Sequence, residues 1–128
     1  MSTREEIRVS GRLELSHSAD AVRAGDALFV AGILPVDFEG RLVGGDDVVE
    51  QARFVFGELG RILVAAGVAF ADVVKVTVFL TDVDDRPKIN PVRQHVFGTA
   101  RPASTLVEVS GLAIPGALIE VDAIAALA

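Results

Sequence analysis

The sequence predicts a single α+β domain, residues 1–128, with two layers: a mixed, roughly six-stranded sheet and two helices on one of its faces. Three observations support this fold class. The length of 128 residues suits one domain. Segments with the two-residue alternation of strands stand on both sides of a segment with helical periodicity. The strands carry apolar residues on both faces, so the helices cover one face and a partner is expected on the other.

The first third of the chain is expected to form short strands joined by turns. Residues 7–15, IRVSGRLEL, alternate around a central Ser-Gly pair and predict a β-hairpin. A Gly-Asp turn then leads into a predicted strand over 27–31. A turn around Gly40, within 37–43, leads into another short strand.

Residues 46–67 predict a long amphipathic helix. Apolar residues recur along them as one stripe with a 3.6-residue period. Asp47 is suited to cap the amino end, and Gly67 is suited to end the helix. Gly57 and Gly60 each weaken a helix by about 1 kcal/mol relative to Ala. Their presence favours close packing of the helix backbone against a sheet.

The second half of the chain predicts strand, helix and two strands. Residues 73–80, VVKVTVFL, are β-branched or apolar at nearly every position and predict a strand. A short helix is expected over 91–97, with Asn90 as its cap and Pro91 in its first turn. The closing strands are predicted over 104–110 and 117–125.

Composition excludes several classes of function. The net charge of −6 and the lack of a basic stripe argue against nucleic-acid binding. Without cysteine, disulfides and thiolate chemistry are excluded. No apolar run has the length of about 18–20 residues that a membrane span needs. The amino-terminal stretch lacks the apolar core of a secretory signal, so a cytoplasmic protein is expected. A hydrophobic content of 51% favours burial at subunit interfaces and hence a homo-oligomer.

The last strand presents two acids on one face. Period 2 places Glu120 and Asp122 on the same side of residues 118–125, about 7 Å apart. A solvated strand face explains such a pair. A functional acid is the alternative, and Glu120 has the more apolar neighbours. A partly buried Glu120 would have a raised pKa and could transfer protons near neutral pH.

Other candidate chemistry is poorly supported by the residues. Ser104, in the segment RPASTLVEVSG, is typical of a residue that starts a strand. A nucleophilic serine needs a base held by a third group, and only His17 and His95 are available. Two distant histidines without cysteine do not indicate a zinc site. The acidic segment 82–85 is either a hard-ion site or, more typically, a solvated turn.

Several motifs together resemble one known family, the Rid (reactive intermediate deaminase) family, also called YjgF or L-PSP-like. The resembling segments cover nearly the whole chain after residue 22, in the family's order and spacing. They are RAGDALFVAGILPVDFEGRLVGGD (23–46), QARFVFGELGRILVAAG (51–67), DVVKVTVFLTDVDD (72–85), IN (89–90), RPASTLVEV (101–109) and IEVDAIA (119–125). The resemblance implies a chorismate-mutase-like fold and a homotrimer with a barrel-like core of sheets. It also implies hydrolysis of enamines and imines, without a cofactor or metal, in clefts between subunits.

The resemblance assigns residues to this cleft. Glu120 falls on the family's water-handling glutamate, and Asn90 on an asparagine near the cleft. Ala31, Gly32 and Ile33 fall on the family's Ser-Gly-Gln segment, and an aromatic position of the cleft falls near Ser18. Leu106 and Ser104 complete the expected lining of the pocket.

The chain departs from the family at the residue that binds the substrate carboxylate. The family's arginine in PARxxVEV is Ser104 here, and a hydroxyl cannot neutralise a carboxylate. Either another arginine substitutes, with Arg101, Arg93 and Arg23 as candidates, or the ligand is not a simple α-imino acid. The leading interpretation is a cofactor-free enamine or imine hydrolase with a non-standard substrate. The alternatives are a non-catalytic trimer that binds a small metabolite or a partner enzyme and, less supported by the acidic charge, a nuclease.

Overall fold

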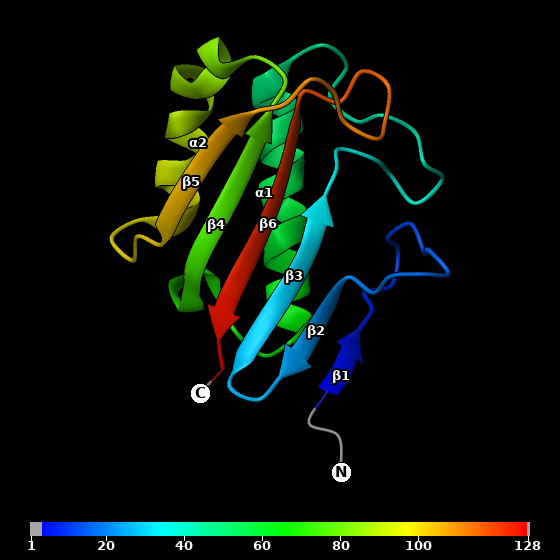
Figure 1. Ribbon diagram of the computed structural model, residues 1–128, viewed down its shortest axis with the longest axis vertical. Coiled ribbons are helices and arrows are strands. Elements are labelled where there is room, and N and C mark those ends of the chain that lie inside the picture. The colour runs from blue at the N-terminus through cyan, green and yellow to red at the C-terminus, as the bar shows by residue number, and fades with distance from the viewer. Residues whose placement is uncertain (1–3, 128) are drawn as a thin grey trace.

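The computed structural model describes residues 4–127, so the ends of the predicted 1–128 domain, residues 1–3 and 128, lie outside it. Along the chain the elements are three strands, a helix, a strand, a second helix and two strands (Figure 1). Their bounds are β1 Arg4–Ile7, β2 Ala21–Ala24, β3 Ala27–Ile33, α1 Val48–Ala65, β4 Val73–Leu80, α2 Arg86–Phe97, β5 Ala103–Glu108 and β6 Ile119–Ala126, with short 3-10 turns at Phe70–Asp72 and Val83–Asp85.

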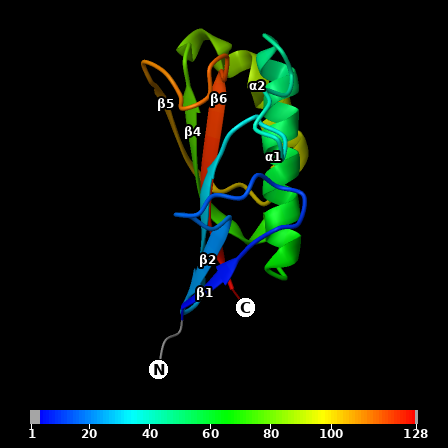
Figure 2. The ribbon, with the colours of Figure 1, turned by 90° about the vertical axis from the view of Figure 1, so that its right-hand side faces the viewer.

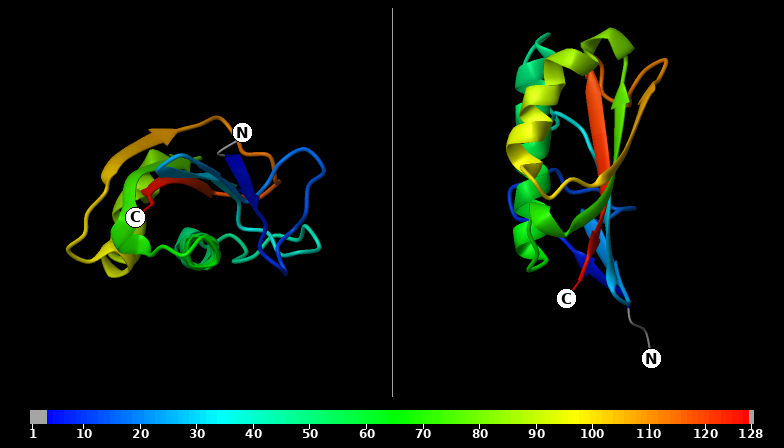
Figure 3. Two further views of the ribbon diagram at one scale, coloured as in Figure 1. Left: turned by 90° about the horizontal axis from the view of Figure 1, so that it is seen from below. Right: turned by 90° about the vertical axis from the view of Figure 1, so that its left-hand side faces the viewer.

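The strands form one mixed sheet in the order β1-β2-β3-β6-β4-β5. β4 and β5 are parallel, whereas the other neighbouring pairs are antiparallel. Both helices lie on the same side of the sheet, and the described chain leaves the opposite side without a helix (Figures 2 and 3). The predicted two-layer α+β fold is therefore confirmed. Over residues 4–127, neither helix combines the length and apolarity that a membrane span requires.

The core lies between α1 and the sheet and is mainly aliphatic. One stripe of α1 is fully buried there, including Phe56, Leu59, Ile62 and Leu63. Asp47 caps this helix, with its carboxylate accepting a hydrogen bond from the backbone N–H of Val49 at 2.9 Å. The predicted helix is confirmed. The predicted role of its glycines is wrong: Gly57 is exposed, and Gly60 makes room for the ring of Phe70, not for the sheet.

The predicted hairpin over 7–15 is wrong. Only its first residue, Ile7, belongs to a strand, and that strand pairs with β2. Side chains form hydrogen bonds with backbone groups that a hairpin would pair with each other. The N–H of Val9 donates to the carboxylate of Asp20, and the carbonyl of Ser10 accepts from Arg61. The segment is therefore a loop that is held by polar side chains.

Residues 37–43 do not contain the predicted strand. They make a single bridge, between Val36 and Leu42, around a turn in which Gly40 has a φ of 82°. The Asp37 carboxylate accepts hydrogen bonds from the N–H groups of Glu39 and Arg41. The backbone of this segment also pairs with itself, since the N–H of Asp37 donates to the carbonyl of Arg41 and the N–H of Val43 donates to that of Pro35. The segment is therefore a closed turn and not a strand of the sheet.

The second helix begins five residues earlier than predicted, at Arg86, and Pro91 lies inside it. Pro87 occupies the first turn, where a missing N–H costs nothing. Ile89 is fully buried by this extra turn, and that burial contributes about 1.5–3 kcal/mol against the cost of an internal proline. Asn90 is consequently a helical residue on α2 and not its cap.

The other predicted strands are confirmed with small shifts. The strand predicted over 27–31 continues to Ile33, and those over 104–110 and 117–125 are β5 and β6. β4 has the predicted bounds, but its register shifts between Val73 and Lys75. That irregularity buries Val73 and leaves Val74 exposed, whereas a strict two-residue alternation continued back from the buried Val76 would bury Val74.

Candidate functional site

Strand β6 divides cleanly into a buried and an open face, as its period predicts. Ile119, Val121, Ala123 and Ala125 are buried under the helices, whereas the residues between them are half-buried on the opposite side. Glu120 pairs with Phe79 of β4, and Asp122 pairs with Thr77. The two acids therefore lie together on the sheet face that no helix covers.

The surroundings of Glu120 keep its carboxyl group available for chemistry. Within residues 4–127 it makes no hydrogen bond or ion pair. Its carboxylate lies against Gly32 so closely that a Cβ atom at position 32 would clash with Oε2. Partial burial raises the pKa of Glu120, and the negative charge of Asp122 raises it further. A carboxyl group with a raised pKa is suited to exchange protons near neutral pH.

Gly32 also belongs to the wall of a cavity of about 540 Å³. The loop between β1 and β2 forms much of this wall, and Ala31, Gly32 and Leu34 form another part. Ser18, where the family's aromatic position falls, lies on this wall as well. The structure thus brings three of the predicted site positions, Ala31, Gly32 and Glu120, close together.

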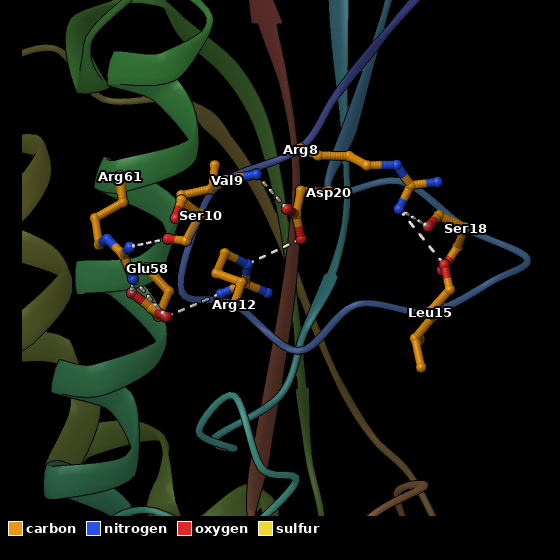
Figure 4. A network of polar contacts seen from close by, with 9 residues as sticks. All are labelled: Arg8, Val9, Ser10, Arg12, Leu15, Ser18, Asp20, Glu58 and Arg61. Atoms are coloured by element: carbon orange, nitrogen blue, oxygen red, sulfur yellow. Dashed lines mark hydrogen bonds and ion pairs between the residues drawn. The ribbon is translucent and has the colours of Figure 1, made fainter.

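A polar network holds the loop of this cavity against α1 (Figure 4). Arg12 lies at its centre, donating to Asp20 at 2.9 Å and to Glu58 of α1 at 3.1 Å. Arg61 binds the other oxygen of Glu58 at 2.8 Å and the carbonyl of Ser10 at 2.7 Å. Since Arg12 and Glu58 are only 13% and 10% exposed, solvent screens their interaction weakly.

Arg12→Ala is expected to lower the free energy of unfolding by about 2–3 kcal/mol, because it leaves the poorly solvated Asp20 carboxylate without its cation and Glu58 with Arg61 alone. Denaturant unfolding measures this change. Arg53→Ala is the matched control: its ion pair with Glu50 is 64% exposed on the Arg53 side, so the loss should stay below about 0.5 kcal/mol. Equal losses in the two variants would contradict this role of the network.

A second cavity, of about 400 Å³, lies between α2 and the start of β5. Asn90, Arg93, Arg101 and Ser104 line it. Arg93 donates from Nη1 to the hydroxyl of Ser104 at 3.2 Å and from Nη2 to the side-chain oxygen of Asn90 at 2.6 Å. Partial burial lowers the pKa of Arg93, as does the nearby positive charge of Arg86.

The Glu120 carboxyl group and the second cavity lie on different sides of the sheet. Ser104 pairs with Val76, whose side chain is buried on the helix side, whereas Glu120 lies on the open side. Within one chain, Glu120 and Ser104 therefore do not face a common space. The sequence predicts a cleft between subunits, and one copy of the chain does not bring these two residues to a common space by itself.

Several other predicted positions lie elsewhere. Ile33 is only 1% exposed and belongs to the core, so its side chain reaches neither cavity. Leu106 is half-buried and packs against the core. Arg23 donates to the carbonyl of Ala66 and pairs with Glu5, so it is engaged away from the site.

The acidic segment 82–85 has a structural use. Asp82 caps the 3-10 turn, and Asp85 pairs with Lys88 at 3.0 Å. No group of three or more His, Asp or Glu side chains within residues 4–127 has the arrangement of a metal site.

The sequence reasoning missed Arg86 as a neighbour of this second cavity. Position 86 lies before the predicted helix over 91–97, so the sequence gives its side chain no direction. Asn90 and Arg93 are three residues apart on one helix, which is a spacing that signals side-by-side positions once the helix is known to include both.

Comparisons with known proteins converge on one family. Residues 12–127 match the sequence model of the family Endoribonuclease L-PSP. A RutC family protein of Pyrococcus horikoshii is 44% identical over 84% of each chain. The 3-aminoacrylate deaminase RutC of Acinetobacter baylyi is 39% identical over 82% of each chain. The 2-iminobutanoate/2-iminopropanoate deaminase of the goat, Capra hircus, is 37% identical over 84% of this chain and 77% of its own.

Solved structures agree with this result. The Rid family protein YyfA of Yersinia pestis superposes with a TM-score of 0.91 at 29% identity, over 98% of this chain and 100% of that one. The structure of E. coli TdcF with bound serine gives a TM-score of 0.86 at 29% identity, over 97% and 99% of the two chains.

Proposed function

The chain belongs to the Endoribonuclease L-PSP family, which includes the Rid and RutC proteins, and on that premise we propose that it is an enamine or imine deaminase. It hydrolyses the C=N bond of a small metabolite to a carbonyl compound and ammonia, without a cofactor. Two similar proteins named as deaminases of 3-aminoacrylate and of 2-iminobutanoate or 2-iminopropanoate support this activity. The position of Glu120 is the structural observation that carries the proposal.

In this mechanism Glu120 acts on water. An enamine first takes a proton on carbon and becomes a protonated imine, whose carbon is electrophilic. Water adds to that carbon while the Glu120 carboxylate accepts a proton from the water. Glu120 returns this proton to the nitrogen of the tetrahedral intermediate. Its carboxylate then accepts the proton of the new hydroxyl group as the C–N bond breaks, so the carbonyl forms and ammonia leaves. A raised pKa suits both steps, since the same group accepts and returns the proton.

The site is completed between copies of the chain, in a homotrimer. Glu120 and the Ser104 cavity lie on opposite faces of one sheet, so a ligand touching both needs a second chain. The open face also carries apolar side chains, with Phe29 48% and Val107 38% exposed. Burying them against another copy is favourable by about 25 cal/mol per Å² of apolar surface.

The mass of the protein in solution tests the proposed trimer. Light scattering of the purified protein should give about three times the chain mass of 13.4 kDa. A mass of one chain across the accessible concentration range would contradict the assembly and, with it, the shared site.

The activity itself is tested with imino acids released in situ by an amino-acid oxidase and trapped by semicarbazide. The chain is expected to reduce the trapped fraction of at least one imino acid and to speed ammonia release. A non-catalytic binding protein is the rival interpretation. Saturable binding of the corresponding keto acids, with no change in trapping for any imine, would favour that rival.

A further inference from the structure

The positive charges of the chain are distributed unevenly. The chain has twelve Lys and Arg residues and eighteen Asp and Glu residues. Most of the basic residues form an ion pair with a carboxylate. Within residues 4–127, those that make no ion pair with a carboxylate are Lys75, Arg86, Arg93 and Arg101. Lys75 donates to Thr105 on the open face. The other three all line the 400 Å³ cavity between α2 and β5.

Within residues 4–127 of one chain, no acidic residue lines the cavity to balance these arginines. Its other polar groups come from Asn90, Gln94 and Ser104. Three guanidinium groups that share one small space without a counter-charge repel one another, and this repulsion is an electrostatic cost even though the chain as a whole has a net charge of −6. An anion in the cavity removes that cost.

Arg93 is oriented in a way that suits a carboxylate. Asn90 and Ser104 accept one N–H from each of its two terminal nitrogens. A guanidinium has five N–H donors, so the remaining donors have no acceptor within the described chain. Two hydrogen bonds hold the plane of the group, and a planar, fixed guanidinium binds a carboxylate through two parallel hydrogen bonds.

Arg86 and Arg101 add positive charge to the cavity beyond the pair that Arg93 would form with one carboxylate. Both are exposed, and neither makes a hydrogen bond or ion pair with another residue in the part of the chain that the structure describes. Arg86 is close enough to lower the pKa of Arg93, so their charges repel across the cavity. A ligand with one negative charge neutralises Arg93 and leaves the other two.

We propose that this cavity binds a small dicarboxylate ligand, with Arg93, held by Asn90 and Ser104, as the anchor for one carboxylate and with Arg86 and Arg101 facing the other. The biological meaning of this inference rests on the proposed function: in a deaminase, a dicarboxylate site makes the substrate an imino or enamine dicarboxylate. The volume of about 400 Å³ fits a metabolite and not a polymer.

Binding of two unreactive acids tests the proposal independently of turnover. Isothermal titration at low salt compares succinate, a dicarboxylate, with butyrate, a monocarboxylate of the same chain length. Succinate is expected to bind the wild-type protein at least tenfold more tightly. Arg93→Met should weaken succinate binding by about 10- to 100-fold, which corresponds to losing charge-assisted hydrogen bonds.

Three further measurements keep the result interpretable. Arg93→Lys, which keeps the charge but not the paired geometry, should fall between the wild type and Arg93→Met. Arg53→Met, which removes an exposed arginine of α1, should bind succinate as the wild type does. Glu120→Gln should also keep succinate binding, so loss of catalysis and loss of this site are distinguished.

Equal affinity for succinate in the wild type and Arg93→Met, or no binding of succinate at all, would overturn the proposal. So would butyrate binding as tightly as succinate. An RNA oligonucleotide that binds more tightly than succinate and loses its affinity in Arg93→Met would overturn it in favour of phosphate recognition.

Discussion

Glu120→Gln is expected to lower kcat for imine hydrolysis by about 10²- to 10⁴-fold, which is the usual contribution of a positioned general base. The amide has nearly the same shape as the carboxyl group but cannot accept the proton from water. Trapping of the imine with semicarbazide measures the loss. A Glu120→Gln enzyme with the wild-type rate would refute the role of this residue.

The same substitution is expected to stabilise the fold at neutral pH. Burial raises the pKa of Glu120 above its unfolded value, so folding favours the protonated form. That contribution is complete below the unfolded pKa and is lost as the pH rises through the folded pKa. At pH 7 the ionised Glu120 therefore lowers stability, and Gln removes that cost.

Thermal unfolding checks this sign. The Tm of Glu120→Gln should exceed that of the wild type at pH 7 and approach it near pH 4.

Asp122→Asn is the matched variant, because it removes the neighbouring charge and leaves the acid in place. It should move the acidic limb of the pH–rate profile to lower pH while keeping turnover. A lower Tm for Glu120→Gln at pH 7 would show that the carboxylate has a stabilising partner.

Gly32→Ala is expected to have the second-largest effect, a loss of about 10²-fold in kcat/KM. A methyl group at position 32 would occupy the place of the Glu120 carboxylate, so the acid must turn away. Displacement of a reacting group by about 1 Å is enough for a loss of this size. The rate of imine hydrolysis measures it, and circular dichroism checks the fold.

The control for this substitution is Gly57→Ala, in the middle of α1. A Cβ atom there meets no atom within 4 Å, and an exposed helix position gains up to about 1 kcal/mol from Ala. Turnover should be unchanged in this variant. Full activity in Gly32→Ala would mean that the carboxylate can work from another position.

The parts of the fold that could be predicted from the sequence are those set by a regular period. The alternation of β6 predicts that Glu120 and Asp122 share one face, and the apolar stripe of α1 predicts its core residues. The segments at 7–15 and 37–43 also look regular, yet they are loops. Their backbone groups bond partly to the side chains of Asp20, Arg61 and Asp37 and partly to each other across turns, and no local pattern reveals such bonds.

The strand period could predict the position of Glu120 in the candidate site. No sequence pattern could predict which long side chains line the second cavity. Asn90 and Ser104 could be assigned by motif, and the structure places them on one cavity. Arg93 was one of three candidate arginines, and spacing could not choose among them. The structure identifies Arg93, because α2 starts early enough to put Asn90 and Arg93 on one helix face opposite Ser104.

The central claim is that one catalytic site draws on two chains, with Glu120 from one copy and the Arg93–Ser104 cavity from its neighbour. Mixing Glu120→Gln with Arg93→Met, after dissociation and reassembly, tests it directly. In randomly mixed trimers about one quarter of the sites would combine both native residues, so activity should recover to about one quarter of the wild-type rate. Activity that stays at the average of the two separate variants would contradict the shared site.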